Sequence, residues 1–171
     1  MNLQKIRSTS VDEFLKSSLS SHQNLDIEVD HSQIGGSGIF GFCNQLAQCD
    51  KLSFLQLMLC ENQLSNEDVE NLGFVLGKFT NLKDLSIYLQ GNQIDQQGTQ
   101  QLGLAISKLH NLKTLNLNLI ENKIQGFSDL CVGLANCIKL SYLELSPRQN
   151  NTLLIKRMVM KFKRLVFFNS F

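Results

Sequence analysis

The chain has 171 residues, with 16 Lys and Arg against 15 Asp and Glu, five Cys, one Pro and no Trp. A hydrophobic content of 43% at this length supports a buried core, and together with a net charge of +1 it argues against a disordered chain. No apolar run is long enough for a transmembrane helix, and residues 1–23 lack the apolar stretch of a signal peptide. Since the Cys residues are irregularly spaced and no export signal precedes them, we expect free thiols and a cytoplasmic protein.

The first 21 residues are predicted to form an N-terminal cap over the first strand of the domain. Ser10 and Glu13 have the spacing of a capping box, in which the two side chains satisfy free backbone N–H groups at the start of a helix. Phe14, Leu15 and Leu19 then supply an apolar face. We therefore predict a short helix from about residue 11 to residue 20.

A pattern of about 30 residues recurs five times between residues 22 and 151. The clearest copy reads Leu82-x-x-Leu85-x-Ile87-x-Leu89-x-x-Asn92-x-Ile94. The other copies begin at His22, Leu52, Leu112 and Leu140, of which the first and the last match the pattern less well. Five copies in register indicate a stack of equivalent units, because self-similarity at a fixed period is the signature of repeat proteins.

Each copy contains one predicted strand followed by one predicted helix. Leu85, Ile87 and Leu89 alternate with polar residues, which is typical of a half-buried strand. Leu102 and Ile106 then lie four residues apart, on one face of a helix. A strand and a helix in constant order predict parallel strands joined by helices, and the units must stack because one unit alone cannot bury its apolar faces.

An Asn recurs where each predicted strand ends, at Asn62, Asn92, Asn122 and less clearly at Asn150. Backbone groups that leave a sheet while still buried need new hydrogen-bond partners. A side-chain amide offers both donors and acceptors, so stacked Asn side chains can bond the backbone of adjacent turns. We interpret these residues as structural rather than as contacts for a ligand.

The repeats resemble leucine-rich repeats, and their long strand-plus-helix form resembles the ribonuclease-inhibitor-like subclass; the resemblance covers about residues 25–150. It implies an α/β solenoid with a curved parallel sheet on the concave side and helices on the convex side. It also implies scaffolding or regulation by binding, as in related arrays that inhibit enzymes or stimulate GTPases. The usual pattern is L-x-x-L-x-L-x-x-N, whereas this chain has an extra x-Leu pair before the Asn. We therefore expect three inward positions and somewhat longer strands in one domain spanning residues 1–171.

Residues 152–171 are predicted to close the stack as a basic C-terminal cap. Leu154, Met158, Phe162 and Leu165 have helical spacing, and a short terminal strand is considered at Phe167 and beyond. Residues 148–171 contain six basic and no acidic side chains, whose main cluster consists of Lys156, Arg157, Lys161, Lys163 and Arg164. This cluster is either the solvated face of a cap helix or a surface for nucleic acid, an acidic protein or membrane headgroups.

No motif for catalysis or for metal binding emerges from the sequence. The three His residues belong to no recognisable nucleophile motif, and the glycines of residues 35–38 lack the Lys-Ser/Thr of a phosphate loop. Cys43 and Cys49 share their spacing with Cys131 and Cys137, but six residues on a helix turn through about 240°, so each pair diverges. We interpret these cysteines as core residues, and we expect no metal, no cofactor and no enzymatic activity.

The residues between the inward positions are predicted to form three outward columns on the concave sheet. Acidic residues gather in the first repeat and apolar or aromatic residues in the centre, a composition typical of an interface. The predicted partner-binding residues are Asp26, Glu28, Asp30, Met58, Tyr88, Gln90, Asn118 and Ile120. We expect a protein partner, with nucleic acid disfavoured and a monomer favoured. The alternatives are anion binding through the basic cluster and head-to-tail assembly of the acidic first repeat with the basic end.

Overall fold

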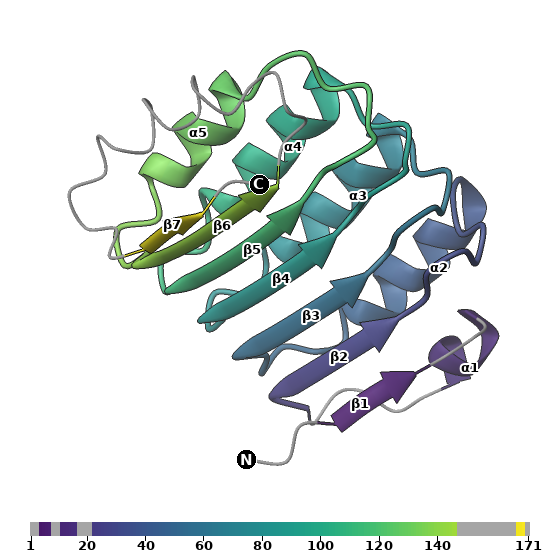
Figure 1. The fold of residues 1–171 in the computed structure, drawn as a ribbon. Helices are drawn as coiled ribbons and strands as arrows, with labels where there is room; N and C mark the ends of the chain where they lie inside the picture. The colour runs from purple at the N-terminus through teal and green to yellow at the C-terminus, as the bar shows by residue number, and fades with distance from the viewer. Residues whose placement is uncertain (1–3, 8–10, 17–21, 147–166, 170–171) are drawn as a thin grey trace.

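The computed structural model describes residues 4–7, 11–16, 22–146 and 167–169 of the chain. Its strands form one parallel sheet in which spatial order follows chain order, and its helices cover one face of that sheet (Figure 1). The strands are β1 Gln4–Arg7, β2 Asn24–Glu28, β3 Phe54–Met58, β4 Asp84–Tyr88, β5 Thr114–Asn118, β6 Tyr142–Ser146 and β7 Phe167–Asn169. The helices are α1 Val11–Lys16, α2 Ser37–Leu46, α3 Asn66–Leu76, α4 Gln96–Ile106 and α5 Ser128–Ala135.

The predicted α/β solenoid is confirmed, with the sheet on the concave side and the helices on the convex side. Strands β2 to β6 pair without any slip between repeats, so that Leu55, Leu85 and Leu115 lie side by side. All three are buried together with their counterparts in the other repeats. A slip of one residue would expose every inward side chain, which is why the alternating pattern fixes the register.

The extra x-Leu pair lengthens the paired segment of each repeat. Leu85, Ile87 and Leu89 are all buried, as are their counterparts in the repeats that begin at His22, Leu52 and Leu112, which confirms three inward positions in these four repeats. Although β3 ends at Met58, pairing continues beyond it, because the Leu59 N–H donates to the Tyr88 carbonyl over 2.9 Å. The third inward residue is therefore held by the backbone of the next repeat.

The Asn residues form a buried ladder, as predicted. The Asn92 Oδ1 accepts hydrogen bonds from the N–H groups of Asn62 and Leu64 at 3.0 and 2.9 Å. Its Nδ2 donates to the carbonyls of Leu59 and Leu89 at 3.0 and 2.9 Å. One side chain thus joins the backbones of two repeats, and Asn62 and Asn122 make equivalent bonds. Asn150 lies outside the described residues.

The N-terminal cap contains a strand that the sequence analysis did not predict. β1 pairs with β2 although its four residues include one apolar side chain, Ile6, and carry no alternating signal. Helix α1 begins at Val11 as predicted, and the Phe14 ring stacks on Phe42 with a centroid separation of 4.7 Å. The remainder of that predicted helix, residues 17–20, lies outside the described residues.

At the other end, β7 forms where a short terminal strand was considered, and it pairs in parallel with β6. The closing helix that we predict before it falls in residues 147–166, outside the described part of the chain. Among the described helices, none combines the length and the apolar character that crossing a bilayer requires.

Candidate functional site

The concave face, defined here as the outward side chains of β2–β6 and of the residues that extend these strands, consists of columns of register neighbours. One column joins Met58, Tyr88 and Asn118, which lie on adjacent strands and are all partly exposed. The sequence analysis found three columns and missed a fourth, because each strand begins one residue before its first inward leucine. The fourth column comprises Asn24, Phe54, Asp84, Thr114 and Tyr142.

A polar network fixes the centre of the concave face. The Asn116 Nδ2 donates to the Tyr88 hydroxyl over 3.3 Å and to the Glu144 carboxylate over 3.1 Å. The Tyr142 hydroxyl donates to the same carboxylate over 3.2 Å. Partial burial raises the pKa of Tyr88, and the Glu144 and Asp26 carboxylates raise it further. Tyr88 therefore stays a neutral phenol over the physiological pH range.

The acidic patch expected from the first repeat is smaller than predicted. Asp26 was expected to be exposed but is only 4% exposed, since β1 and β3 flank its strand and the Gln56 Nε2 donates to it over 2.9 Å. The Asp30 Oδ1 accepts the Cys60 N–H over 2.6 Å and thereby stabilises a turn. Glu28 stays partly exposed. Of the three carboxylates, Asp26 is thus buried and Asp30 bonds a backbone N–H, while Glu28 lies at a partly exposed position of the face.

The remaining predicted contact residues lie near the carboxyl ends of the strands. The Gln90 Nε2 donates to a Glu121 carboxylate oxygen over 3.4 Å. The Asn118 Oδ1 accepts the Ile120 N–H over 3.0 Å. Both side chains are thus held by neighbours, and Ile120 is half-buried. The structure brings these residues together with Tyr88 on one face.

In the described strands β2–β6 the outward positions carry charge of one sign. The acidic residues of the concave face are Asp26, Glu28, Asp30, Asp84 and Glu144, and none of its outward positions in the described strands β2–β6 holds a Lys or Arg. The basic cluster of Lys156, Arg157, Lys161, Lys163 and Arg164 lies outside the described residues. Within the described ranges, no three His, Cys, Asp or Glu side chains come together as they would around a metal ion.

Thiol labelling will distinguish the concave face from the core. Cys43, Cys49, Cys131 and Cys137 are buried, whereas Cys60 is partly exposed. Burial, followed by the Asp30 charge, raises the pKa of Cys60 to about 11. Because the thiolate is the reactive form, we expect a thiol reagent to label the native protein slowly and at Cys60 alone. As long as the pH is below that pKa, the labelling rate should increase about tenfold for each unit by which the pH rises.

Mass spectrometry after labelling at a series of pH values tests this expectation. The variant Cys60→Ser should remove the labelling of the native protein, and all five wild-type thiols should react after unfolding. Rapid labelling of Cys43 in the native state would contradict the buried position of α2.

The convex face carries an apolar row that the sequence analysis missed. Phe74, Leu104 and Val132 lie on α3, α4 and α5 and are 64%, 55% and 63% exposed. Each follows an inward leucine of its helix by two residues, and this regular spacing is the signal that could have revealed the row. The row stands out because none of the apolar side chains on the concave face is as exposed.

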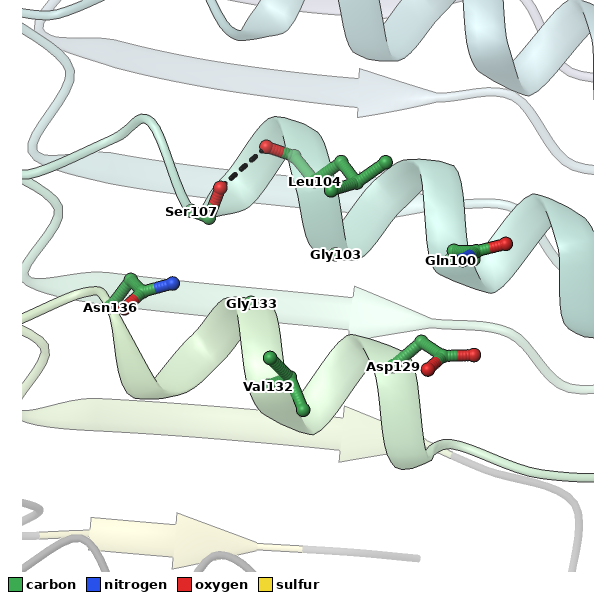
Figure 2. Close-up of a pocket in the computed structure, with 8 residues that line it drawn as sticks. All are labelled: Gln100, Gly103, Leu104, Ser107, Asp129, Val132, Gly133 and Asn136. Carbon is green, nitrogen blue, oxygen red and sulfur yellow. Dashed lines mark hydrogen bonds between the residues drawn. The ribbon is translucent and has the colours of Figure 1, made fainter.

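Grooves lie between the members of this convex row. Figure 2 shows the groove of about 200 Å³ between α4 and α5, with Leu104 and Val132 on its two sides and Asp129 near one end. A similar groove of about 190 Å³ lies between α3 and α4, beside Phe74. The convex face therefore alternates apolar side chains with shallow depressions.

No family model matches this chain, and no curated protein matches it. Among solved structures, the chain is similar to internalin C2 from Listeria monocytogenes str. 4b F2365, a leucine-rich-repeat protein, with 22% identity and a TM-score of 0.50. The match covers 90% of this chain and 64% of that chain, so the chain spans less than two thirds of the length of internalin C2. At this identity the likeness establishes a leucine-rich-repeat fold in general and no finer subclass.

Proposed function

We propose that this chain is a non-catalytic protein-binding module whose concave face receives a basic segment of a partner protein. The supporting observation is the composition of that face. Tyr88, Phe54 and Tyr142 lie among carboxylates such as Glu28 and Glu144, without a Lys or Arg at any outward position of β2–β6. A leucine-rich-repeat solenoid agrees with such a role, because its strands present adjacent side chains as one extended surface. The full helices α3 and α4 favour the ribonuclease-inhibitor-like subclass.

The chemistry of the face selects the kind of partner. Carboxylates attract Lys and Arg side chains, and aromatic faces bind the same cations through their π electrons. The Tyr88 ring is held by the bond between its hydroxyl and Asn116, so little side-chain entropy is lost when a partner docks. Arg is the better ligand of the two cations, since it can stack on Tyr88 and bond Glu144 with its planar fork.

The size of the concave face limits the contact. Five strands about 4.8 Å apart span roughly 20 Å, which is less than a standard interface of about 800 Å² per partner requires. The partner therefore also contacts the loops at the strand ends, where Glu61 and Glu121 are exposed. The Glu61 carboxylate lies 3.2 Å from the His31 imidazole, and the exposed Lys123 follows Glu121 by two residues, so these loops add polar groups rather than a purely acidic surface.

Truncating the centre of the concave face tests this function. We expect the double variant Tyr88→Ala, Met58→Ala to bind its partner about thirtyfold more weakly, because two central side chains of an interface together contribute about 2 kcal/mol. Pull-down from the native cell followed by mass spectrometry identifies the partner, and titration with the purified partner gives the affinity.

The matched control is Phe74→Ala, which removes an aromatic side chain of the convex face. Circular dichroism establishes that both variants fold. Equal retention of every partner by the wild type and by the folded double variant would refute the concave surface as the binding site. Binding that does not weaken at high salt would refute the basic character of the partner.

A further inference from the structure

The lysines of the described repeats gather along one edge of the molecule. This edge consists of the four turns between α2 and β6 that lead from a helix to the next strand, and Figure 1 shows the strand starts side by side there. Of the seven lysines between residues 22 and 146, only Lys123 lies elsewhere, and these four turns contain one carboxylate, that of Asp50. The other six lysines are exposed and define the basic edge: Lys51, Lys78, Lys83, Lys108, Lys113 and Lys139.

The opposite edge, where the strands end and the helices begin, is predominantly acidic. Glu61, Glu67 and Glu121 are exposed there, and Lys123 is the one lysine in the described turns of that edge. The repeats therefore have a separation of charge that the net charge of +1 does not reveal. Such a separation orients a molecule in a field, so an anionic surface attracts the basic edge and repels the acidic one.

The convex row adjoins the basic edge. Phe74 precedes Lys78 by four residues, about one helical turn, and the Lys78 Nζ lies 4.2 Å from the centroid of the Phe74 ring. Leu104 and Lys108 have the same spacing at the end of α4. Ile138, in the turn before β6, is 67% exposed. Exposed apolar side chains and lysines thus form one continuous surface, defined here as the attachment surface, which comprises the convex row, Ile138 and the basic edge.

We propose that the attachment surface binds the protein to a bilayer that contains anionic lipids. The C-terminal ends of α3, α4 and α5 point toward the bilayer, and their acidic N-terminal ends point away from it. The lysines contact the lipid headgroups, since their long apolar stems extend while the ammonium groups stay in water. The convex row and Ile138 enter the boundary between headgroups and acyl chains. The concave face lies on the other side of the sheet and stays accessible to a protein partner (Figure 1).

The chemistry of the attachment surface selects a lipid bilayer among anionic partners. Exposed apolar side chains become buried at a bilayer interface, whereas the backbone of a nucleic acid offers them no apolar environment. Residues 22–146 contain no Arg, the side chain that recognises phosphates and bases with its planar fork. Lysines act as point charges, which suit a diffuse anionic surface. A fluid bilayer also adapts to a convex face, whereas a folded protein partner needs a complementary shape.

The expected attachment is weak and reversible. Each lysine near an anionic membrane surface raises the affinity about fivefold. The Glu70 carboxylate, one helical turn before Phe74, opposes the attachment, as does that of Asp50. Salt should release the protein, because it screens the lysines from the headgroups. This inference goes beyond the proposed function and does not depend on it, although an attached protein would present its concave face to partners on the same membrane at a raised local concentration.

Co-sedimentation of the whole chain with lipid vesicles tests the attachment. The wild type should pellet with vesicles of equal parts phosphatidylcholine and phosphatidylserine, remain in solution with phosphatidylcholine alone, and be released by high salt. A wild type that does not bind the mixed vesicles, or that binds both kinds equally, overturns the proposal. Tighter binding to duplex DNA than to the mixed vesicles overturns the choice of a lipid surface.

Matched substitutions locate the contact. Lys108→Gln should weaken vesicle binding about fivefold, whereas Lys123→Gln, the same change of charge at the opposite edge, should weaken it less than about twofold. Leu104→Gln should also weaken it, unlike Phe40→Gln, which changes a 60% exposed aromatic residue of α2 outside the row. Circular dichroism establishes that the variants fold. Equal effects within either pair overturn the attachment surface.

The basic cluster near the C-terminus requires its own control, since it lies outside the described residues. The triple variant Lys156→Gln, Arg157→Gln, Lys161→Gln should still bind the mixed vesicles. Complete loss of binding in this variant would assign the membrane contact to the cluster and overturn the proposal. The concave variant Tyr88→Ala, Met58→Ala should bind vesicles like the wild type, so the two proposals fail or succeed separately.

Discussion

Replacing Asn92 with Ala is expected to lower the free energy of unfolding by about 4 kcal/mol, because the buried N–H groups of Asn62 and Leu64 and the buried Leu59 carbonyl lose the partner that Asn92 supplies, while the Leu89 carbonyl keeps its bond from Asn122. Each unsatisfied buried group costs about 1–3 kcal/mol, and partial access of water reduces the sum. The loss is large against a total stability of about 5–15 kcal/mol for a domain. Urea unfolding followed by circular dichroism measures it, since the chain has no Trp for fluorescence.

The matched control is Asn111→Ala. The Asn111 Nδ2 also donates to a carbonyl of the preceding repeat, that of Thr80, over 2.8 Å, but this bond is exposed to water. Its removal should cost less than about 1 kcal/mol, because water replaces the lost partner. If the two variants lost equal stability, burial would not be the source of the strength of the ladder.

The fold was predictable because its main determinants repeat. Alternate leucines specify which side chains face inward, and the copies fix the register, so Leu55, Leu85 and Leu115 come together as expected. The Asn ladder was predictable for the same reason, since a polar residue that recurs beside buried leucines needs backbone partners. β1 was missed because its residues carry no such repeating signal.

The candidate site was only partly predictable, because exposure depends on neighbours that the repeat does not specify. Asp26 fits the outward pattern, yet a strand on each side and a bond from Gln56 bury it. Tyr142 lies outside the predicted columns because strand ends cannot be placed to one residue from alternation alone. Its contact with Glu144 joins it to the central network.

The convex row shows a different limit of the sequence. The position of Phe74 relative to Leu72 repeats in the next two helices, so the sequence contains the row. Its meaning depends on what covers the helices, since an apolar residue at the same spacing in a buried helix would belong to the core. Only the exposed fraction of these side chains, 55% or more in all three, distinguishes a surface from a core.

Gly133→Ala is expected to destabilise the protein by about 2 kcal/mol, although Ala is normally the better residue within a helix by about 1 kcal/mol. A Cβ on Gly133 would collide with the backbone of Gly103, including its carbonyl oxygen, and would lie 2.7 Å from the Gly103 Cα. Since no flexible side chain is available to move aside, α5 as a whole must shift away from α4, and such overpacking costs about 1–3 kcal/mol. Thermal and urea unfolding measure the loss.

Gly41→Ala provides the control with the opposite sign. Gly41 lies within α2, and a Cβ there would meet only the Leu15 side-chain methyl groups, at an ordinary contact distance of 3.7 Å. This variant should be more stable than the wild type by about 0.5–1 kcal/mol. The two substitutions are chemically identical, so opposite signs would show that backbone contact between α4 and α5, and not helix propensity, decides the spacing of the convex helices. A Gly133→Ala protein as stable as the wild type would mean that α4 and α5 are not in direct backbone contact.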